Sequence, residues 1–110
     1  MDFTEYQIKA RHTAIYPDID ANIYYPALGL ASEAGEVCGK IKKIMRDNGG
    51  VVSMETRLKL TDELGDVLWY VSNLASELDI DLERMAVRNI DKLALRKERN
   101  TLKGDGDNRW

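Results

Sequence analysis

TDELGDVLWYVSNLASEL, residues 61–78, is the stretch that decides the fold. Apolar side chains recur in it at the 3.6-residue spacing of one helical face: Leu64, Val67, Leu68, Val71, Leu74, Ala75 and Leu78. This stripe predicts a helix that packs one side against the rest of the molecule. Two carboxylates, Glu63 and Asp66, open the same stretch beside the stripe. Because charged side chains are seldom buried without a partner, this acidic pair needs an explanation.

The sequence around this stretch predicts three more helices. Pro17 and the aspartates of YPDID (residues 16–20) favour a turn after the first helix. Pro26 suits the first turn of the second helix, and Ser53 is a good N-cap for the third. The predicted helices cover about residues 2–14, 26–47, 54–78 and 82–99. Residues 100–110 lack a helical period and are predicted to form a loop-like tail.

These elements predict an all-α fold in one domain over residues 1–110. The expected subunit is of the four-helix bundle type, with two long central helices. So short a chain leaves apolar surface uncovered, and Trp69 lies nearly opposite the main stripe of its helix. We therefore expect a homodimer, or a homotetramer made of two dimers, with the functional site near the subunit interface.

The bulk composition excludes several classes of protein. A net charge of −3 and a pI of about 5.2 argue against a protein that binds nucleic-acid polymers, which usually carries a basic face. No uncharged apolar run is long enough for a membrane span, and the N-terminus lacks the apolar core of a signal peptide. The single cysteine, Cys38, favours a reducing cytoplasm, and its place in an apolar pattern predicts core packing.

A second acidic pair, Glu33 and Glu36, lies in the predicted second helix. Residues three apart share one helical face, so each central helix carries a carboxylate pair beside its apolar stripe. If these helices pack together, the four carboxylates face one another and repel unless cations neutralise them. Ligands that are all oxygen favour Mg²⁺, with Mn²⁺ as a substitute. A di-iron site is a poor alternative, since no Glu-x-x-His pair occurs in the sequence.

The competing interpretation is that both pairs lie on solvated helix faces, as most single Glu-x-x-Glu pairs do. Gly35 and Gly65 argue against it, because each interrupts an acidic pair within a helix, where glycine costs roughly 1 kcal/mol relative to alanine. A glycine within both pairs suggests the close approach of a neighbouring helix or of a ligand.

Two segments taken together resemble a known family. GLASEAGEVCGKIKK (residues 29–43) followed by DELGDVLWYVSNLA (residues 62–75) is similar to the MazG family of nucleoside triphosphate pyrophosphohydrolases. The signature of that family is Glu-x-x-Glu, a spacer and Glu-x-x-Asp. EYQIKARHTA (residues 5–14) and KGDGDNR (residues 103–109) resemble its short, stand-alone and phage-type members. The resemblance covers most of the chain and implies an all-α fold.

The resemblance implies an enzyme that cleaves a nucleoside or deoxynucleoside triphosphate between its α- and β-phosphates, giving the monophosphate and pyrophosphate. It implies that Mg²⁺ neutralises phosphate charge and helps to activate water. The implied metal ligands are Glu33, Glu36, Glu63 and Asp66, and either Glu33 or Glu36 is the general base. House-cleaning of the nucleotide pool is the role expected of the family.

The resemblance and the helical spacing also suggest residues that bind the substrate. Asn89 and Lys92 share a face of the fourth helix and fit contacts to phosphate or to a coordinated water. Lys40 and Lys43 follow the first acidic pair, and either is a candidate phosphate ligand, with an ion pair to Asp47 as the alternative for Lys43. Tyr70 lies one turn beyond the second pair and is expected to contact the sugar or the base. In the tail, Arg109 is the candidate that folds back over a nucleotide.

Two alternatives to an enzyme fit the same pattern. A nucleotide-binding or regulatory helical module would keep the acidic site and turn over little substrate. A purely structural dimerisation protein would show neither turnover nor stabilisation by metal. The sequence does not reveal the base preference, because the acidic pairs would recognise the part that all nucleotides share.

Overall fold

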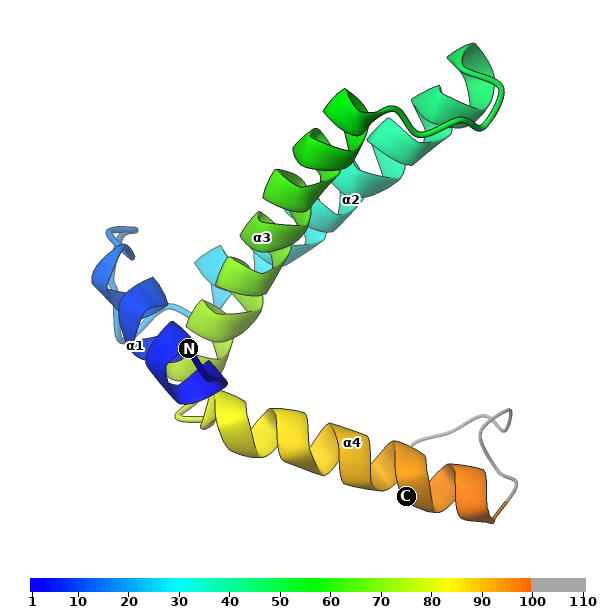
Figure 1. The fold of residues 1–110 in the computed structure, drawn as a ribbon. Helices are drawn as coiled ribbons and strands as arrows, with labels where there is room; N and C mark the ends of the chain where they lie inside the picture. The colour runs from blue at the N-terminus through cyan, green and yellow to red at the C-terminus, as the bar shows by residue number, and fades with distance from the viewer. Residues whose placement is uncertain (100–110) are drawn as a thin grey trace.

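Four helices and no strands make up residues 1–99, the part of the chain that this computed structural model describes, and they confirm the all-α class. The helices are α1 (Phe3–His12), α2 (Tyr24–Asp47), α3 (Met54–Glu77) and α4 (Leu82–Glu98). α2 and α3 form a long antiparallel hairpin, α1 lies across its base, and α4 leaves the base in a different direction (Figure 1). Although α2 and α3 each contain 24 residues, no described helix is both long and apolar enough to cross a membrane.

The hairpin forms because the sequence supplies a helix cap and a glycine turn where they are needed. The Ser53 side chain accepts a hydrogen bond from the Thr56 N–H at 3.1 Å, which confirms the predicted N-cap of α3. Between α2 and α3, Gly49 and Gly50 adopt φ angles of 59° and 80°, a region in which glycine has no steric penalty. This short connection returns α3 along α2, so positions on the two helices face each other in reverse order.

The buried core lies at the base of the hairpin, where α1, the α1–α2 connection and the start of α4 meet the end of α3. Its buried apolar side chains are Ala10, Ala14, Tyr16, Pro26, Ala75 and Leu82. Along the rest of the hairpin, Ile44 is the one buried apolar side chain within residues 1–99. The hairpin is therefore an arm two helices thick that is held at one end.

A fully buried carboxylate near the end of α3, Glu77, fixes the α1–α2 connection. It accepts hydrogen bonds from the Tyr16 hydroxyl and from the Arg11 guanidinium, the latter at 2.6 Å. The backbone N–H groups of Asp20 and Asn22 also donate to it, at 3.0 and 2.8 Å. Burial alone raises the pKa of Glu77, but these hydrogen bonds outweigh burial and lower the pKa to about 2. One charged group thus ties the connection to α3.

We expect Glu77→Gln to lower the free energy of unfolding at pH 7 by about 3 kcal/mol, because a buried ion pair loses one partner. Since the pKa of Glu77 in the folded state lies below its ordinary value of 4.5, the stabilisation is present at neutral pH. It is lost as the pH falls from 4.5 toward about 2. Urea unfolding at several pH values measures both effects. Glu55→Gln, at an exposed position of α3, is the control, and equal unfolding curves for the two variants would contradict this account.

The helix count and the two long helices match the expectation, but α4 does not close a bundle within one chain. It contacts α1 and α3 but not α2, and it runs away from the hairpin (Figure 1). The Gln7 side chain fixes the start of α4 by accepting a hydrogen bond from the Leu82 N–H at 2.9 Å. Asp79, with a φ of 55°, makes the sharp turn before it. Apolar side chains of α4 such as Val87 and Ile90 therefore stay exposed.

Two smaller expectations are corrected by the structure. Cys38 is exposed and does not pack in a core, because the arm covers only one side of α2. Trp69 is half-buried within its own chain, since α1 packs against α3 and the indole N–H donates to Thr13 Oγ1 at 2.7 Å. Trp69 is therefore not an exposed apolar side chain that needs a partner chain to cover it.

Candidate active site

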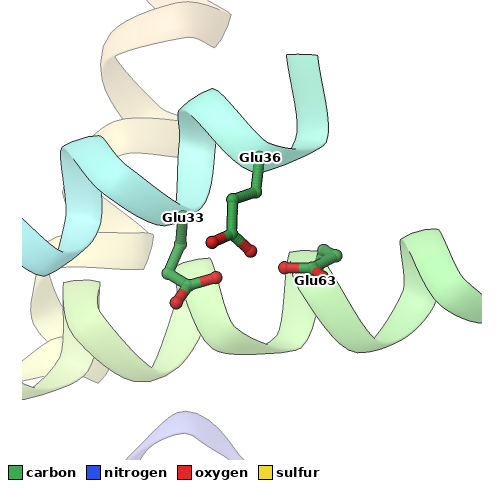
Figure 2. Close-up of side chains that lie close together, drawn as sticks. All are labelled: Glu33, Glu36 and Glu63. Atoms are coloured by element: carbon green, nitrogen blue, oxygen red, sulfur yellow. The ribbon is translucent and has the colours of Figure 1, made fainter. Parts of the chain in front are cut away.

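Three carboxylates from two helices converge along the hairpin. Glu33 and Glu36 come from α2, and Glu63 comes from the facing part of α3 (Figure 2). One oxygen of each lies within 4.8 Å of the others. Spacing of three residues puts the first two on one face of α2, and the reversed direction of α3 brings Glu63 opposite them. The structure thus gathers three of the four predicted metal ligands.

The electrostatics of this acidic cluster favour a bound cation. Glu33 and Glu63 are half-buried, and the Oε2 atom of each is buried without a hydrogen-bond partner among residues 1–99. Such oxygens are costly, because they have lost water without gaining a donor. Lys40 Nζ lies 3.8 Å from Glu63 Oε1, but one lysine cannot balance three carboxylates. Since hard divalent cations prefer oxygen ligands, the residues present fit Mg²⁺ or Mn²⁺.

The fourth predicted ligand, Asp66, is not among the converging oxygens. It is exposed on α3, about one helical turn beyond Glu63. Burial is the main cause of the raised pKa of Tyr70, and the nearby charge of Asp66 adds to it. Asp66 is thus outside the group of converging oxygens in the described chain and stays a predicted ligand.

Tyr70 packs directly against α2 next to the acidic cluster. At Gly29, one turn before Glu33, an added Cβ would lie 2.2 Å from the Tyr70 ring, so glycine is the residue that leaves room for it. The Tyr25 ring approaches Tyr70 with 6.5 Å between centroids, and it stacks on the buried Tyr16 ring at 4.9 Å. The predicted nucleoside contact Tyr70 thus belongs to a row of tyrosines that borders the cluster.

The close approach of the two helices occurs at a glycine that the sequence analysis did not select. A Cβ added at Gly35 or Gly65 would meet nothing within 4 Å in the described chain beyond its own helix. The close contact is at Gly29. The signal that identifies it is the reversed register of the hairpin, because Gly29 lies one turn before the first acidic pair and Tyr70 lies one turn after the second.

Lys43, a predicted phosphate ligand, lines a cavity of about 220 Å³ on the side of the cluster that faces the hairpin tip. Lys40 and Lys59 line the same cavity. Lys59 was not among the candidates from sequence, although the reversed register identifies it: it lies one turn before Glu63, as Lys40 lies one turn after Glu36. Three lysines at one cavity suit a phosphate group.

Two further candidates are not brought to the acidic cluster within one chain. Asn89 and Lys92 lie on α4, which does not contact α2 and extends away from the hairpin (Figure 1). Arg109 lies outside the described residues. Among the described residues of one chain, the candidates near the acidic cluster therefore lie on α2 and α3.

Fold and site together define an all-α protein with a cluster of three carboxylates between two antiparallel helices. The sequence profile of the MazG nucleotide pyrophosphohydrolase domain matches residues 26–100, and the chain belongs to this family. The match contains all three converging carboxylates. It confirms the resemblance found in the sequence and indicates pyrophosphohydrolase chemistry at the level of the family.

One relative shows the same similarity over almost its whole length. The chain is 50% identical over 109 residues to the Gene 37 protein of Mycobacterium phage L5, an alignment that covers 94% of this chain and 96% of the phage protein. The name of that protein states no activity. No solved structure matches the chain significantly.

Proposed function

We propose that this protein is a metal-dependent hydrolase of nucleoside or deoxynucleoside triphosphates that cleaves between the α- and β-phosphates. The family supports pyrophosphohydrolase chemistry, and the acidic cluster supports the place for it. The single observation that carries the proposal is the presence of buried oxygens on Glu33 and Glu63 without a hydrogen-bond partner in the described chain. House-cleaning of the nucleotide pool in the cytoplasm is the role we propose.

Four carboxylates would hold the divalent cation, Mg²⁺ or Mn²⁺: Glu33, Glu36, Glu63 and Asp66. When bound, the ion offsets the phosphate charge and lowers the pKa of water. Glu33 or Glu36 takes the proton of the attacking water as general base, and Glu36 is the more exposed of the two. Lys43 attracts the phosphate chain from the cavity that it lines, and Tyr70 borders the nucleoside.

Identification of the products tests this proposal. The purified protein is incubated with Mg²⁺ and each of the canonical and several modified nucleoside and deoxynucleoside triphosphates, and the products are read by ³¹P NMR. We expect equal amounts of monophosphate and pyrophosphate from at least one substrate. Orthophosphate and a diphosphate as the primary products would contradict the proposed bond. Tight binding of a nucleotide without turnover would favour the regulatory module.

The exposed surface supports an assembly of more than one chain. Leu28, Met45 and Leu58 are among the exposed apolar side chains of the hairpin. We therefore propose a homodimer or a homotetramer of two dimers. In such an assembly a partner chain could bring its Asn89 and Lys92 to the acidic cluster, because α4 runs away from the hairpin of its own chain.

We expect sedimentation velocity at micromolar concentration to show a dimer or a larger species, since apolar surface that one chain leaves exposed is covered by another. Activity is measured on the same fractions. A monomer that keeps full activity would contradict the proposed assembly and the place of the site near an interface.

We propose that residues 1–110 form one domain. The family match begins at residue 26, but α1 lies before it and packs against α3 at the base of the hairpin. Arg11 of α1 donates to the buried Glu77 of α3, so the two parts share one core. Arg109 of the tail remains a proposed contact to the nucleotide.

A further inference from the structure

Three kinds of side chain follow one another along the hairpin from its base to its tip. Tyrosines lie at the base side of the acidic cluster, around Gly29. The carboxylates come next, and the lysines of the 220 Å³ cavity lie beyond them. From Gly29 to Lys40 the helix rises about 16 Å, which is the length scale of an extended nucleoside triphosphate. A substrate laid along the hairpin would therefore meet aromatic, acidic and basic groups in that order.

The part of the hairpin around Gly29, nearest the buried core, is suited to a nucleoside. The Tyr70 ring packs closely against α2 at Gly29, because Gly29 has no side chain there. Tyr25 is 44% exposed and is backed by the stacked, buried ring of Tyr16, whose hydroxyl donates to Glu77. Exposed aromatic faces stack on nucleobases, and a phenol can also hydrogen-bond to a sugar. The row of tyrosines is thus a fixed, partly apolar surface beside the carboxylates.

The tip side is suited to phosphates. Lys40 connects the two regions, since it pairs with Glu63 and also lines the cavity with Lys43 and Lys59. Asp47 lines this cavity as well, but its carboxylate is paired with the Arg46 guanidinium at 2.7 Å. Ammonium groups attract the multiply charged end of a polyphosphate more strongly than its nucleoside end.

The geometry points to a fixed direction of the substrate along the hairpin, an inference that rests on the proposed function. The nucleoside lies against Tyr70 and Tyr25, the anhydride between the α- and β-phosphates lies at the acidic cluster, and the β- and γ-phosphates extend toward Lys43 and Lys59. Water adds across this anhydride: its oxygen bonds to one phosphorus, and the bridging oxygen leaves with the other. The monophosphate is then released from the end of the site near Gly29, and pyrophosphate from the end near the hairpin tip.

Inhibition by the two products tests the direction. The probes are inorganic pyrophosphate and the monophosphate of whichever triphosphate the wild type turns over fastest. We expect Tyr70→Leu to weaken inhibition by the monophosphate about tenfold, the effect of one lost base stack, and to leave inhibition by pyrophosphate unchanged. We expect Lys59→Gln to do the reverse. It should weaken inhibition by pyrophosphate about tenfold, through loss of a charged hydrogen bond, and leave inhibition by the monophosphate unchanged.

Matched variants separate these effects from general damage. Gly29→Ala displaces the Tyr70 ring without removing it and is expected to act like Tyr70→Leu, whereas Gly39→Ala has open space around the new Cβ and should leave both inhibition constants unchanged. Tyr70→Phe keeps the aromatic face and should retain inhibition by the monophosphate. Lys42→Gln removes a lysine that does not line the cavity and is the control for charge.

The outcomes distinguish a wrong direction from a wrong function. If the wild type hydrolyses no triphosphate, the proposed function fails. If the wild type is active but Tyr70→Leu weakens only inhibition by pyrophosphate and Lys59→Gln weakens only inhibition by the monophosphate, the substrate lies in the opposite direction. If Tyr70→Leu and Lys59→Gln each weaken inhibition by both products equally, neither end of the hairpin is selective and the inferred direction is wrong.

Discussion

Glu63→Gln is expected to lower turnover of the preferred triphosphate at saturating Mg²⁺ by at least about two orders of magnitude. Glu63 is the carboxylate that α3 contributes to the two from α2, and its Oε2 is buried without a hydrogen-bond partner in the described chain. Glutamine keeps the size and polarity of the side chain but removes the negative charge. The predicted loss corresponds to several kcal/mol of charge stabilisation that the cluster no longer provides.

Asp62→Asn is the matched control for this variant. Asp62 is the neighbour of Glu63 in sequence, is exposed, and is not among the converging carboxylates, so the same loss of charge occurs one position away. We expect it to keep wild-type turnover. Steady-state rates are compared after circular dichroism has shown equal helix content. Rates near that of the wild type for both Glu36→Gln and Glu63→Gln would rule out the assigned site.

Removal of divalent metal is expected to reduce turnover to the background rate, and added Mg²⁺ or Mn²⁺ to restore it. The physical reason is the charge of the site: three carboxylates within 4.8 Å, with one lysine at 3.8 Å, repel a triphosphate unless cations lie between them. The measurement is pyrophosphate release after dialysis against a chelator, followed by titration with each metal. Full turnover with the chelator present would contradict the metal requirement.

Thermal unfolding provides an independent control for the same prediction. A cation that binds only the folded protein stabilises it by about 2.7 kcal/mol at a concentration of one hundred times its Kd. Mg²⁺ should therefore raise the Tm of the wild type and of Asp62→Asn, and raise that of Glu63→Gln much less. An equal rise in all three proteins would show that the stabilising metal binds elsewhere.

Much of the fold follows from local features of the sequence. The apolar stripe in residues 61–78 predicts α3, and Ser53 predicts its start, because both act over a few neighbouring residues. The direction of α4 does not follow in this way. It depends on a hydrogen bond between Gln7 and Leu82, which are far apart in the chain, and on the positive φ of Asp79. Helical periodicity contains no information about either.

In the candidate site, too, local features could be predicted from the sequence, and contacts between distant residues could not. Spacing of three residues predicts each acidic pair, and the hairpin brings Glu33, Glu36 and Glu63 together. Contacts across the hairpin depend on register, which no single helix encodes. Gly29 and Lys59 were therefore missed, although each lies one turn from an acidic pair.

The buried network at the base of the hairpin was also invisible to the sequence analysis. Glu77 belongs to a polar helix end and looks like a solvated residue until Arg11 and Tyr16 are folded against it. Its partners lie more than fifty positions away in the chain. A pattern that reports only on neighbouring residues cannot reveal such a charge.

The central claim, that the three converging carboxylates hold a divalent cation, is tested most directly by titrating the metal-free protein with Mn²⁺ and counting free ions by electron paramagnetic resonance. No substrate is needed, so the result does not depend on knowing the preferred nucleotide. We predict that wild type and Asp62→Asn bind Mn²⁺ with the same affinity, and that Glu63→Gln binds it at least about tenfold more weakly. Equal Mn²⁺ affinity in wild type and Glu63→Gln would contradict the account.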